Sequence, residues 1–395
     1  MDQSTDAWPA PAYLPSRELP DPLTFLDGTR VETPDHWMRR REELRTLFRH
    51  YVYGYAPAVT DVDATVRDET SVLDGAAVHR SLGLQIPSLP AATPSIPVSL
   101  FVPADATDAP VIIGLNKNGN HAVVDDPSVP VTDVATGERG SRAEVWELAY
   151  LIERGYALCA LHGGSVDPDV DDFTNGVHPH VDPAAAGWPT GSEWGTLSAW
   201  AWGVQRCVDF CTDADGIDGD RILVIGHSRR GKASLLAGAT DDRIDVVVPH
   251  QSGTGGTALS RQNGQESLAD ITATFPHWFC DRFHGFAGRP DRLPVDQHLL
   301  MAMVAPRALL DTQGERDYWA NPGRALDALR AAAPVWDLLG ATGMVGEGIN
   351  HGGPVGDAPG DLLHYRHDTA HMLGQPYWET ILDFADRHIG STRTT

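Results

Sequence analysis

The chain has 395 residues, 42% of them hydrophobic, so it can bury one large core or two modest ones. Its formal net charge of −24 argues against a nucleic-acid partner, because neutralising phosphates requires a basic face. Four cysteines are too few for a disulfide scaffold, and no apolar run is long enough to span a membrane, so both of those protein classes are excluded.

Two features of the charged residues are unusual. Acidic residues comprise 40 Asp and 14 Glu, which indicates either a composition bias of the genome or a protein that works in high salt. Only two of the 30 basic residues are lysines, Lys117 and Lys232. Because lysine is so rare in this chain, the presence of Lys232 in a glycine-rich turn indicates that its side chain has a function.

The N-terminal region is Pro- and Asp-rich, and we expect residues 1–30 to form an arm ahead of a single domain over residues 31–395. The first residues lack the basic and apolar regions of a signal peptide. The chain as written is therefore expected in the cytoplasm, and it would be secreted or periplasmic if its N-terminus were trimmed.

A helix is predicted from Asp35 to Tyr53, with Asp35 as its N-cap.

The remaining pattern predicts an α/β fold. Alternating apolar and polar residues predict an N-terminal antiparallel extension, with strands at 62–66, 77–85 and 97–102. Continuous apolar runs, separated by helix-length segments, predict a mostly parallel central sheet that is buried on both faces, with strands at 111–115, 157–161, 222–225, 246–249 and 308–310. The flanking helices are predicted at 142–154, 194–212, 232–239, 322–340 and 376–388.

One turn between a strand and a helix has the composition of a nucleophile site. The sequence Gly226-His227-Ser228-Arg229-Arg230-Gly231-Lys232 follows the apolar run 221–225 and precedes a helix of small residues. Serine nucleophiles of this kind usually lie in G-x-S-x-G, whereas here the second glycine comes one residue later. The alternative is that Ser228 is an ordinary helix N-cap, which is common in such turns.

The order of the other candidates along the chain is that of a serine hydrolase with an α/β fold, in which the acid and then the histidine follow the serine. Asp317 lies just after the predicted strand 308–310, and Glu315 is its rival two residues away. His371 precedes the last helix and competes with three other histidines, His351, His364 and His367. Serine needs such a base because a hydroxyl is a weak nucleophile at neutral pH, and the base needs a carboxylate to fix its tautomer.

Metal binding is the alternative for two residue groups. His364, His367 and His371 could present three imidazoles on one helical face, although the segment has no clear helix start or acidic ligand pattern. Cys207 and Cys211 are four residues apart on a predicted helix but lack further ligands at matching spacing. We therefore expect no metal and no organic cofactor.

The chain resembles the glucuronoyl esterases of carbohydrate esterase family 15, particularly their bacterial branch. Several separate motifs in the same order carry the resemblance, which extends from about Trp37 to Arg387: residues 114–121, 167–169, 194–196 with 199–203, 226–232, 275–280, and 293–298 with 305–307. The resemblance implies an α/β-hydrolase fold. It also implies that a second glycine one residue late is the usual form of the nucleophile turn, or elbow, in this family and that Ser228 is the nucleophile.

The resemblance assigns roles to further residues. Arg229 matches the arginine that stabilises the oxyanion, and the spacing to the closing helix selects His371. The substrate-binding residues that it implies, which would hold the glucuronic acid ring, are Lys232, Glu266 and Trp319. Many members carry their acid where this chain has Gln251, and a neutral amide cannot stabilise an imidazolium. Asp317, on the later loop, is then the acid, and Gln251 hydrogen-bonds near the histidine in the substrate site.

These residues predict a monomeric serine esterase that cleaves the ester between (4-O-methyl-)glucuronic acid of glucuronoxylan and a lignin alcohol. One alternative is a serine carboxylesterase of the same fold that acts on another acyl group, such as acetylated xylan or a different uronate ester. A second alternative, from a different class, is a non-catalytic relative that binds carbohydrate. Partners other than the carbohydrate ester, including nucleic acid and membrane, are not expected.

Overall fold

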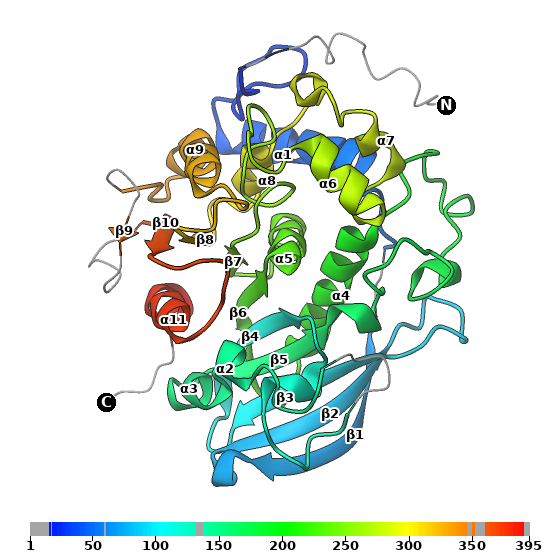
Figure 1. The fold of residues 1–395 in the computed structure, drawn as a ribbon, viewed down its shortest axis with the longest axis vertical. Coiled ribbons are helices and arrows are strands. Elements are labelled where there is room, and N and C mark those ends of the chain that lie inside the picture. Colours follow the sequence, from blue (N-terminus) through cyan, green and yellow to red (C-terminus); the bar gives the residue numbers. More distant parts are fainter. Residues whose placement is uncertain are drawn as a thin grey trace.

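The parallel sheet and its antiparallel extension form one continuous structure. A computed structural model of the chain describes residues 16, 18–58, 61–131, 137–345, 350–351 and 360–390. Within these residues, ten strands form one sheet in the order β1-β2-β3-β5-β4-β6-β7-β8-β10-β9 (Figure 1). Pairings from β1 to β5 are antiparallel, and all pairings from β5 to β9 are parallel. The predicted fold class is therefore confirmed.

Each predicted strand overlaps a strand of the structure, and most of the observed strands are longer; β2 agrees at both ends, whereas β1 and β8 continue well past the predicted 62–66 and 308–310. The strands are β1 (Asp63–Val72), β2 (Ala77–Gln85), β3 (Ile96–Pro103), β4 (Asp108–Asn116), β5 (Ala157–His162), β6 (Gly216–His227), β7 (Val246–His250), β8 (Ala308–Gly314), β9 (Asn350–His351) and β10 (Leu362–His367). The prediction missed β9 and β10. Half of β10 is polar or charged, and its sequence does not show the continuous apolar run of the other parallel strands.

Helices cover both faces of the sheet. They are α1 (Pro34–Phe48), α2 (Ala143–Trp146), α3 (Leu148–Glu153), α4 (Thr196–Cys211), α5 (Arg229–Thr240), α6 (Leu268–Thr274), α7 (Asp281–His284), α8 (Gln297–Ala302), α9 (Pro322–Ala332), α10 (Pro334–Leu338) and α11 (Gln375–Ile389). A π-helical turn, Arg49–Tyr53, continues α1. Figure 1 shows α2, α3 and α11 on one side of the parallel strands, with α4 and α5 on the other.

Alternation along each strand divides the interior into two cores. In β6, Ile222 and Val224 pack with α4 and α5 in the first core, whereas Leu223 and Ile225 pack with α11 in the second. Successive side chains of a strand point to opposite faces, so a strand covered by helices on both sides must be apolar throughout. This requirement explains the continuous apolar runs by which the sequence revealed these strands.

Three helix boundaries differ from the predicted ones for local reasons. The N-cap of α1 is Thr33 rather than Asp35, because Pro34 takes the first helical position and the Thr33 Oγ1 accepts from the backbone N–H of His36 at 3.2 Å. The helix predicted at 142–154 is divided at Glu147, which has a φ of 47°. The helix predicted at 322–340 is divided before Pro334, whose ring cannot continue the hydrogen-bond ladder.

All four cysteines are buried and carry free thiols: Cys159, Cys207, Cys211 and Cys280. They belong to the core between the sheet and the α4 and α5 helices, which is the ordinary environment of a small hydrophobic side chain. Burial raises the pKa of the Cys280 thiol to about 12.

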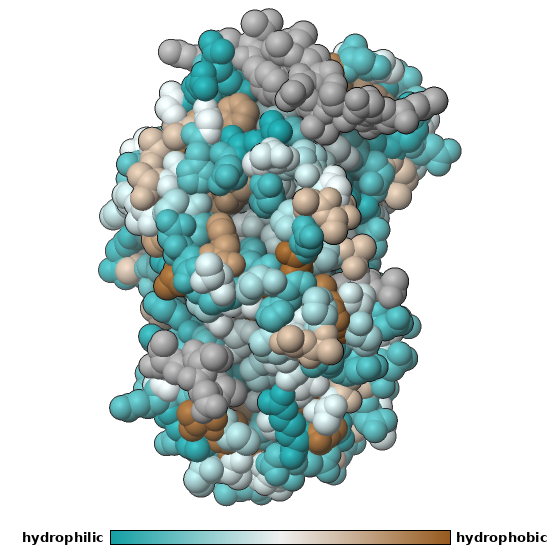
Figure 2. All heavy atoms as spheres, turned by 90° about the vertical axis from the view of Figure 1, so that its right-hand side faces the viewer, coloured by the Kyte–Doolittle hydropathy of each residue, from teal (hydrophilic) through white to brown (hydrophobic). Residues whose placement is uncertain are grey.

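The surface is mainly polar. Figure 2 shows one face on which hydrophilic residues dominate and hydrophobic residues occur in small separate patches. The described helices include none with the length and apolar content needed to cross a bilayer. The division into an arm of residues 1–30 and a single domain of residues 31–395 stays a prediction, since residues 1–15 and 17 lie outside the described part of the chain.

Candidate active site

Ser228 lies in a strained turn between β6 and α5. Its φ of 62° and ψ of −126° are unusual for a residue with a side chain, and its side chain caps no helical N–H group. The backbone N–H of Ser228 donates to the carbonyl oxygen of His250 on the neighbouring strand at 2.9 Å. The N-cap alternative is therefore wrong, because the Ser228 side chain makes no capping hydrogen bond to the helix that follows. Strain at such a turn is the geometry of a nucleophile elbow.

Both glycines of the turn are required by close backbone contacts. A Cβ on Gly226 would lie 2.4 Å from the carbonyl of Arg230, and one on Gly231 would lie 2.8 Å from the carbonyl oxygen of Gly226. Neither distance is compatible with a side chain. The shift of the second glycine by one residue therefore still gives the close approach of strand and helix that the elbow needs.

His371 lies in the loop between β10 and α11, and it is paired with Asp317. The Asp317 Oδ2 lies 2.6 Å from the His371 Nδ1, and Asp317 is 5% exposed. A carboxylate oxygen only accepts, so the His371 Nδ1 carries the hydrogen and its Nε2 is left as a proton acceptor. Of the two candidate acids, Asp317 is the one that makes this contact.

The serine and the histidine share one cleft. The cleft has a volume of about 420 Å³ and is lined by Leu115, Asn116, Lys117, Asn118, Arg142, Val145, Trp146, His227, Ser228, Arg229, Arg230, His371, Met372 and Leu373. Serine, histidine and carboxylate thus meet at the carboxyl ends of β6, β10 and β8, although Ser228 and His371 are 143 positions apart in the chain. This is the arrangement that the sequence order predicted.

Arg229 is held rigidly next to the serine. Its Nη1 donates to the Asp169 Oδ2 at 2.7 Å, and its Cζ lies 4.5 Å from the ring centroids of both Phe275 and Trp278. Burial would raise the pKa of Asp169, but hydrogen bonds from His277 and Trp278 and the charge of Arg229 outweigh it and hold that pKa well below its usual range. The arginine is therefore a fixed cation whose partner stays ionised.

Lys232, Glu266 and Trp319 form a connected group. The Lys232 Nζ donates to the carbonyl oxygens of Ser252 and Thr254, each at 2.6 Å, and lies 3.9 Å from Glu266. The Trp319 Nε1 donates to the Glu266 Oε1 at 3.1 Å, while the tryptophan itself is 58% exposed. Burial lowers the pKa of Lys232 to about 8, and the charge of Glu266 opposes this shift. The three residues predicted to bind substrate thus lie together.

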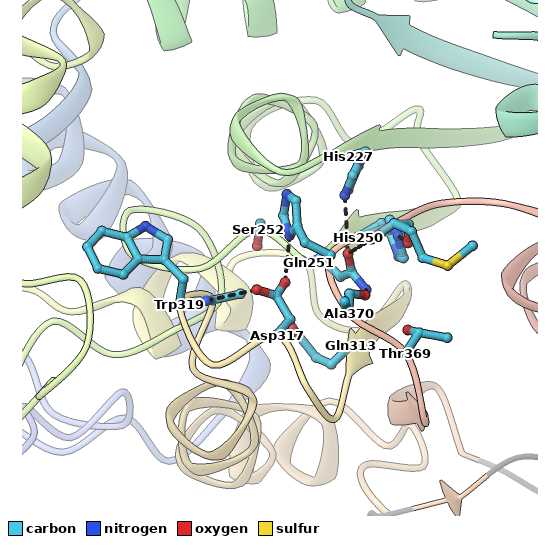
Figure 3. A network of polar contacts seen from close by, with 12 residues as sticks. His227, His250, Gln251, Ser252, Gln313, Asp317, Trp319, Thr369 and Ala370 are labelled. Carbon is cyan, nitrogen blue, oxygen red and sulfur yellow. Dashed lines mark hydrogen bonds and ion pairs between the residues drawn. The ribbon is translucent and has the colours of Figure 1, made fainter.

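Gln251 supports the loop between β10 and α11 that carries His371, the histidine loop. Its Oε1 accepts from the backbone N–H of Met372 at 2.9 Å and from the His227 Nε2 at 3.1 Å. Its Nε2 donates to the carbonyl oxygen of Ala370 at 3.3 Å and to the Tyr377 hydroxyl at 3.0 Å. Figure 3 shows Gln251 between His227 and Ala370. It is 1% exposed, so the prediction that it contacts substrate is corrected: its amide contacts the residues on either side of His371.

Two histidines that the sequence analysis did not single out also support this loop. The His250 Nε2 donates to the carbonyl oxygen of Met372 at 2.9 Å, and burial lowers the pKa of His250 to about 3. The His227 ring packs against the His371 ring with centroids 4.3 Å apart. Burial first, and then the nearby charges of His250 and His371, hold the pKa of His227 well below its usual range. In the sequence, His227 precedes Ser228 and His250 precedes Gln251, and this adjacency was the available sign that both histidines lie at the site.

Two of the three rival histidines, His364 and His367, have other partners. The His364 Nδ1 lies 2.7 Å from the Asp311 Oδ2 in a fully buried pair, and the His364 Nε2 accepts from the Arg366 Nε at 2.8 Å. His367 bonds to Thr380 at 3.0 Å. Because His364 and His367 lie on β10 and His371 lies in the following loop, the three imidazoles do not share a helical face, and that alternative is wrong.

Comparisons with known proteins agree with this geometry. Residues 188–340 match the sequence profile of the family described as glucuronyl esterase, fungi. A carbohydrate esterase from an unknown prokaryotic organism is 34% identical over 397 residues, covering 96% of this chain and 91% of that protein. The 4-O-methyl-glucuronoyl methylesterase 1 of Wolfiporia cocos is 29% identical over 342 residues, covering 84% of this chain and 74% of that protein.

The same relationship is seen in three dimensions. The structure of the glucuronoyl esterase from Solibacter usitatus superposes on this chain with a TM-score of 0.87, at 29% sequence identity, covering 96% of this chain and all of that one. Similarity of sequence over nearly the whole chain, together with the same fold, leads to one conclusion. The chain belongs to carbohydrate esterase family 15, the glucuronoyl esterases.

Proposed function

We propose that the protein is a serine esterase that cleaves the ester between the C6 carboxyl of (4-O-methyl-)glucuronic acid on glucuronoxylan and an alcohol of lignin. The observation that carries this proposal is the joint placement of two groups around Ser228. His371, paired with Asp317, lines the serine's cleft, while Lys232, one turn further along α5, belongs to a buried polar group suited to a sugar. The relatives named as glucuronoyl esterases support the choice of acyl group.

The chemistry follows from the proton positions. With its Nδ1–H directed at Asp317, His371 takes the proton of Ser228 on Nε2, and the serine oxygen attacks the C6 carbonyl carbon. The imidazolium then gives its proton to the leaving alcohol, and the C6–oxygen bond of the ester breaks. Water repeats the two steps on the glucuronoyl-enzyme and releases the glucuronoxylan with its C6 carboxyl free.

Negative charge on the carbonyl oxygen is stabilised next to Ser228. Because α5 begins at Arg229, the N–H group of Arg229 is among those that a helix leaves without an intrahelical acceptor. The guanidinium of the same residue is fixed by Asp169 and by two aromatic rings. A donor and a cation that are held in place before the reaction stabilise the oxyanion far more than mobile water does.

The sugar ring is recognised by hydroxyl contacts in this proposal. Lys232 has one ammonium hydrogen left after its bonds to two carbonyl oxygens, and Glu266 offers oxygens in the same buried group. Trp319 is exposed beside them with its ring available for a sugar face. Lys232 is charged below about pH 8 and neutral above it. The KM for glucuronate esters should therefore rise as the pH increases through about 8.

The experiment measures kcat and KM on benzyl glucuronate and on p-nitrophenyl acetate. We expect the native enzyme to prefer the glucuronate ester, Ser228→Ala to lose activity on both esters, and Lys232→Met to raise the KM for the glucuronate ester alone. The rise of KM above pH 8 should be missing in Lys232→Met. Activity on acetate alone would instead support an esterase for another acyl group, and activity on neither ester would support the carbohydrate-binding alternative.

A further inference from the structure

The cleft that holds Ser228 has an unusual charge for this protein. The chain carries 54 Asp and Glu residues and a net charge of −24, yet none of the described residues lining the cleft is acidic. Four of them are cations: Lys117, Arg142, Arg229 and Arg230. One of the only two lysines in the chain therefore lies here, and the other, Lys232, lies outside the lining of this cleft in the group with Glu266.

Two of the four cations already have partners. Arg229 is paired with Asp169 at 2.7 Å. Arg230 is 6% exposed, its Nε donates to the carbonyl oxygen of Asn116 at 2.9 Å, and its guanidinium lies over the Trp200 ring. Arg229 is assigned to the oxyanion and Arg230 is buried, so neither guanidinium is left to bind a charge on the leaving group.

Lys117 and Arg142 are exposed and lack a carboxylate partner within the described residues. The Arg142 Nε donates to the Asn118 Oδ1 at 2.8 Å, which orients the guanidinium beside the cleft and leaves its charge unneutralised. Partial burial and the nearby charges of Arg230, Arg229 and Arg142 lower the pKa of Lys117 and outweigh the opposing charge of Asp169, as expected where cations gather. Uncompensated cations of this kind attract a negative ligand.

The position of His371 identifies which part of the substrate enters this cleft. The histidine must reach the oxygen of the leaving alcohol to protonate it, so the alcohol lies on the histidine's side of the serine. His371, Met372 and Leu373 line the cleft, whereas Lys232, Glu266 and Trp319 do not. The residues assigned to the acyl group thus lie outside this cleft, whereas the histidine that protonates the alcohol lines it, so this cleft faces the alcohol.

We propose that the cleft is a leaving-group subsite for alcohols that carry a negative charge, with Lys117 and Arg142 as the residues that recognise the anion. Val145, Trp146 and Leu373 line the same cleft and fit an apolar body between the ester oxygen and the charge. The preferred alcohol is therefore an aryl or alkyl alcohol with a carboxylate at its far end. The inference rests on the proposed function, because it takes the acyl side to be glucuronate.

The test compares two benzyl esters of glucuronic acid that differ only in charge. One carries a para-carboxylate on the benzyl ring and the other a neutral para-carboxamide of similar size. We expect kcat/KM for the charged ester to exceed that for the neutral one by about fivefold at low salt, as an ion pair near a surface contributes up to about 1 kcal/mol. The ratio should fall towards one in Lys117→Met and in Arg142→Met, and in the native enzyme at high salt.

The control variant removes a cation elsewhere. Arg30→Met takes away an exposed arginine that is paired with Asp21, and it should leave the ratio unchanged. A ratio of one in the native enzyme would overturn the subsite while leaving the proposed function intact. A ratio that falls equally in Arg30→Met would also overturn it, because net charge would then be the cause. Cleavage of p-nitrophenyl acetate with neither glucuronate ester turned over would instead overturn the proposed function.

Discussion

At the scale of single residues, two strained positions define the site. Ser228 and Gln251 both have positive φ angles, 62° and 46°, and they follow the ends of the adjacent strands β6 and β7. Residues with side chains rarely adopt such angles, so the surrounding contacts must hold them there. Ser228 is held by the carbonyl oxygen of His250, and Gln251 is held by the loop that carries His371. The strain therefore places the nucleophile and the support of its base side by side.

Replacing Asp317 with asparagine should lower kcat by roughly a thousandfold or more, with little change in KM. The amide can hold the histidine in the wrong tautomer, and it provides no negative charge to stabilise the imidazolium that forms during attack. Steady-state kinetics on benzyl glucuronate would measure the loss.

The matched control is Glu315→Gln, which removes a carboxylate two residues away. We expect near-native kcat in this variant, because the His371 Nδ1 bonds to Asp317. The reverse pattern, with Glu315→Gln inactive and Asp317→Asn active, would show that the acid was assigned to the wrong residue.

Individual residues differed in how far the sequence could identify them. Ser228 was evident because an elbow needs a local pattern of strand, glycines and helix. The choice between Asp317 and Glu315 was open, since two carboxylates on one turn have the same composition and only the direction of the side chain separates them. The contacts that hold Arg229 were not predictable from spacing, because Asp169 and Trp278 come from segments far apart in the chain.

At the scale of elements, the loop between β10 and α11 is held from three directions. Gln251 bonds to Ala370 and Met372, and His250 bonds to the carbonyl oxygen of Met372. Thr369 bonds to the hydroxyl of Tyr377 on α11. These contacts fix the backbone on both sides of His371, although the histidine side chain itself is 42% exposed. The position of the general base is thereby fixed as closely as it would be on a helix or strand, although the residue lies on a loop.

Gln251→Ala should lower kcat by about tenfold to a hundredfold, because the loop loses its central support and His371 spends less time in the productive position. The free energy of unfolding should also fall, since each lost hydrogen bond contributes on the order of 1 kcal/mol. Rapid kinetics on the glucuronate ester and thermal unfolding would report the two effects.

The matched control for this loss is Gln297→Ala. Gln297 is equally buried, and its amide donates to Tyr53 and Gly256 away from the histidine loop. It should lower the melting temperature and leave kcat near the native value. Equal losses of kcat in both variants would mean that the effect of Gln251 is general destabilisation rather than support of the loop.

The elements themselves were partly predictable. Strands covered on both faces were found because every side chain in them must be apolar. In β10, in contrast, His364 is buried against Asp311 and is hydrogen-bonded to Arg366, so polar residues occupy core positions without breaking the strand. Pairing between distant residues satisfies these groups, and a single sequence does not show such pairing.

At the scale of the whole molecule, charge is distributed unevenly. The net charge is −24, whereas the described lining of the serine cleft contains cations and no carboxylate. Mutual repulsion among surface carboxylates destabilises the folded state and is screened by salt, while the attraction of the cleft for an anion is screened by the same ions. Salt should therefore act in opposite directions on stability and on capture of a charged substrate.

Raising sodium chloride from 0.05 to about 1 M should increase the melting temperature by several degrees. At about 1 M salt, repulsion between exposed carboxylates extends over only about 3 Å, so it no longer destabilises the folded state. Differential scanning calorimetry at fixed pH would measure the shift. An unchanged or lower melting temperature would show that the acidic composition is a compositional bias without a role in stability.

The four buried cysteines have a practical consequence for studying the enzyme. Because every thiol of the chain is free and enclosed in the core, maleimide dyes should leave the folded protein unlabelled. A single cysteine introduced at the exposed position Tyr318, next to Trp319, would then be the one site of attachment. The native sequence is thus already a background for fluorescence measurements at the mouth of the site, with no cysteine to remove first.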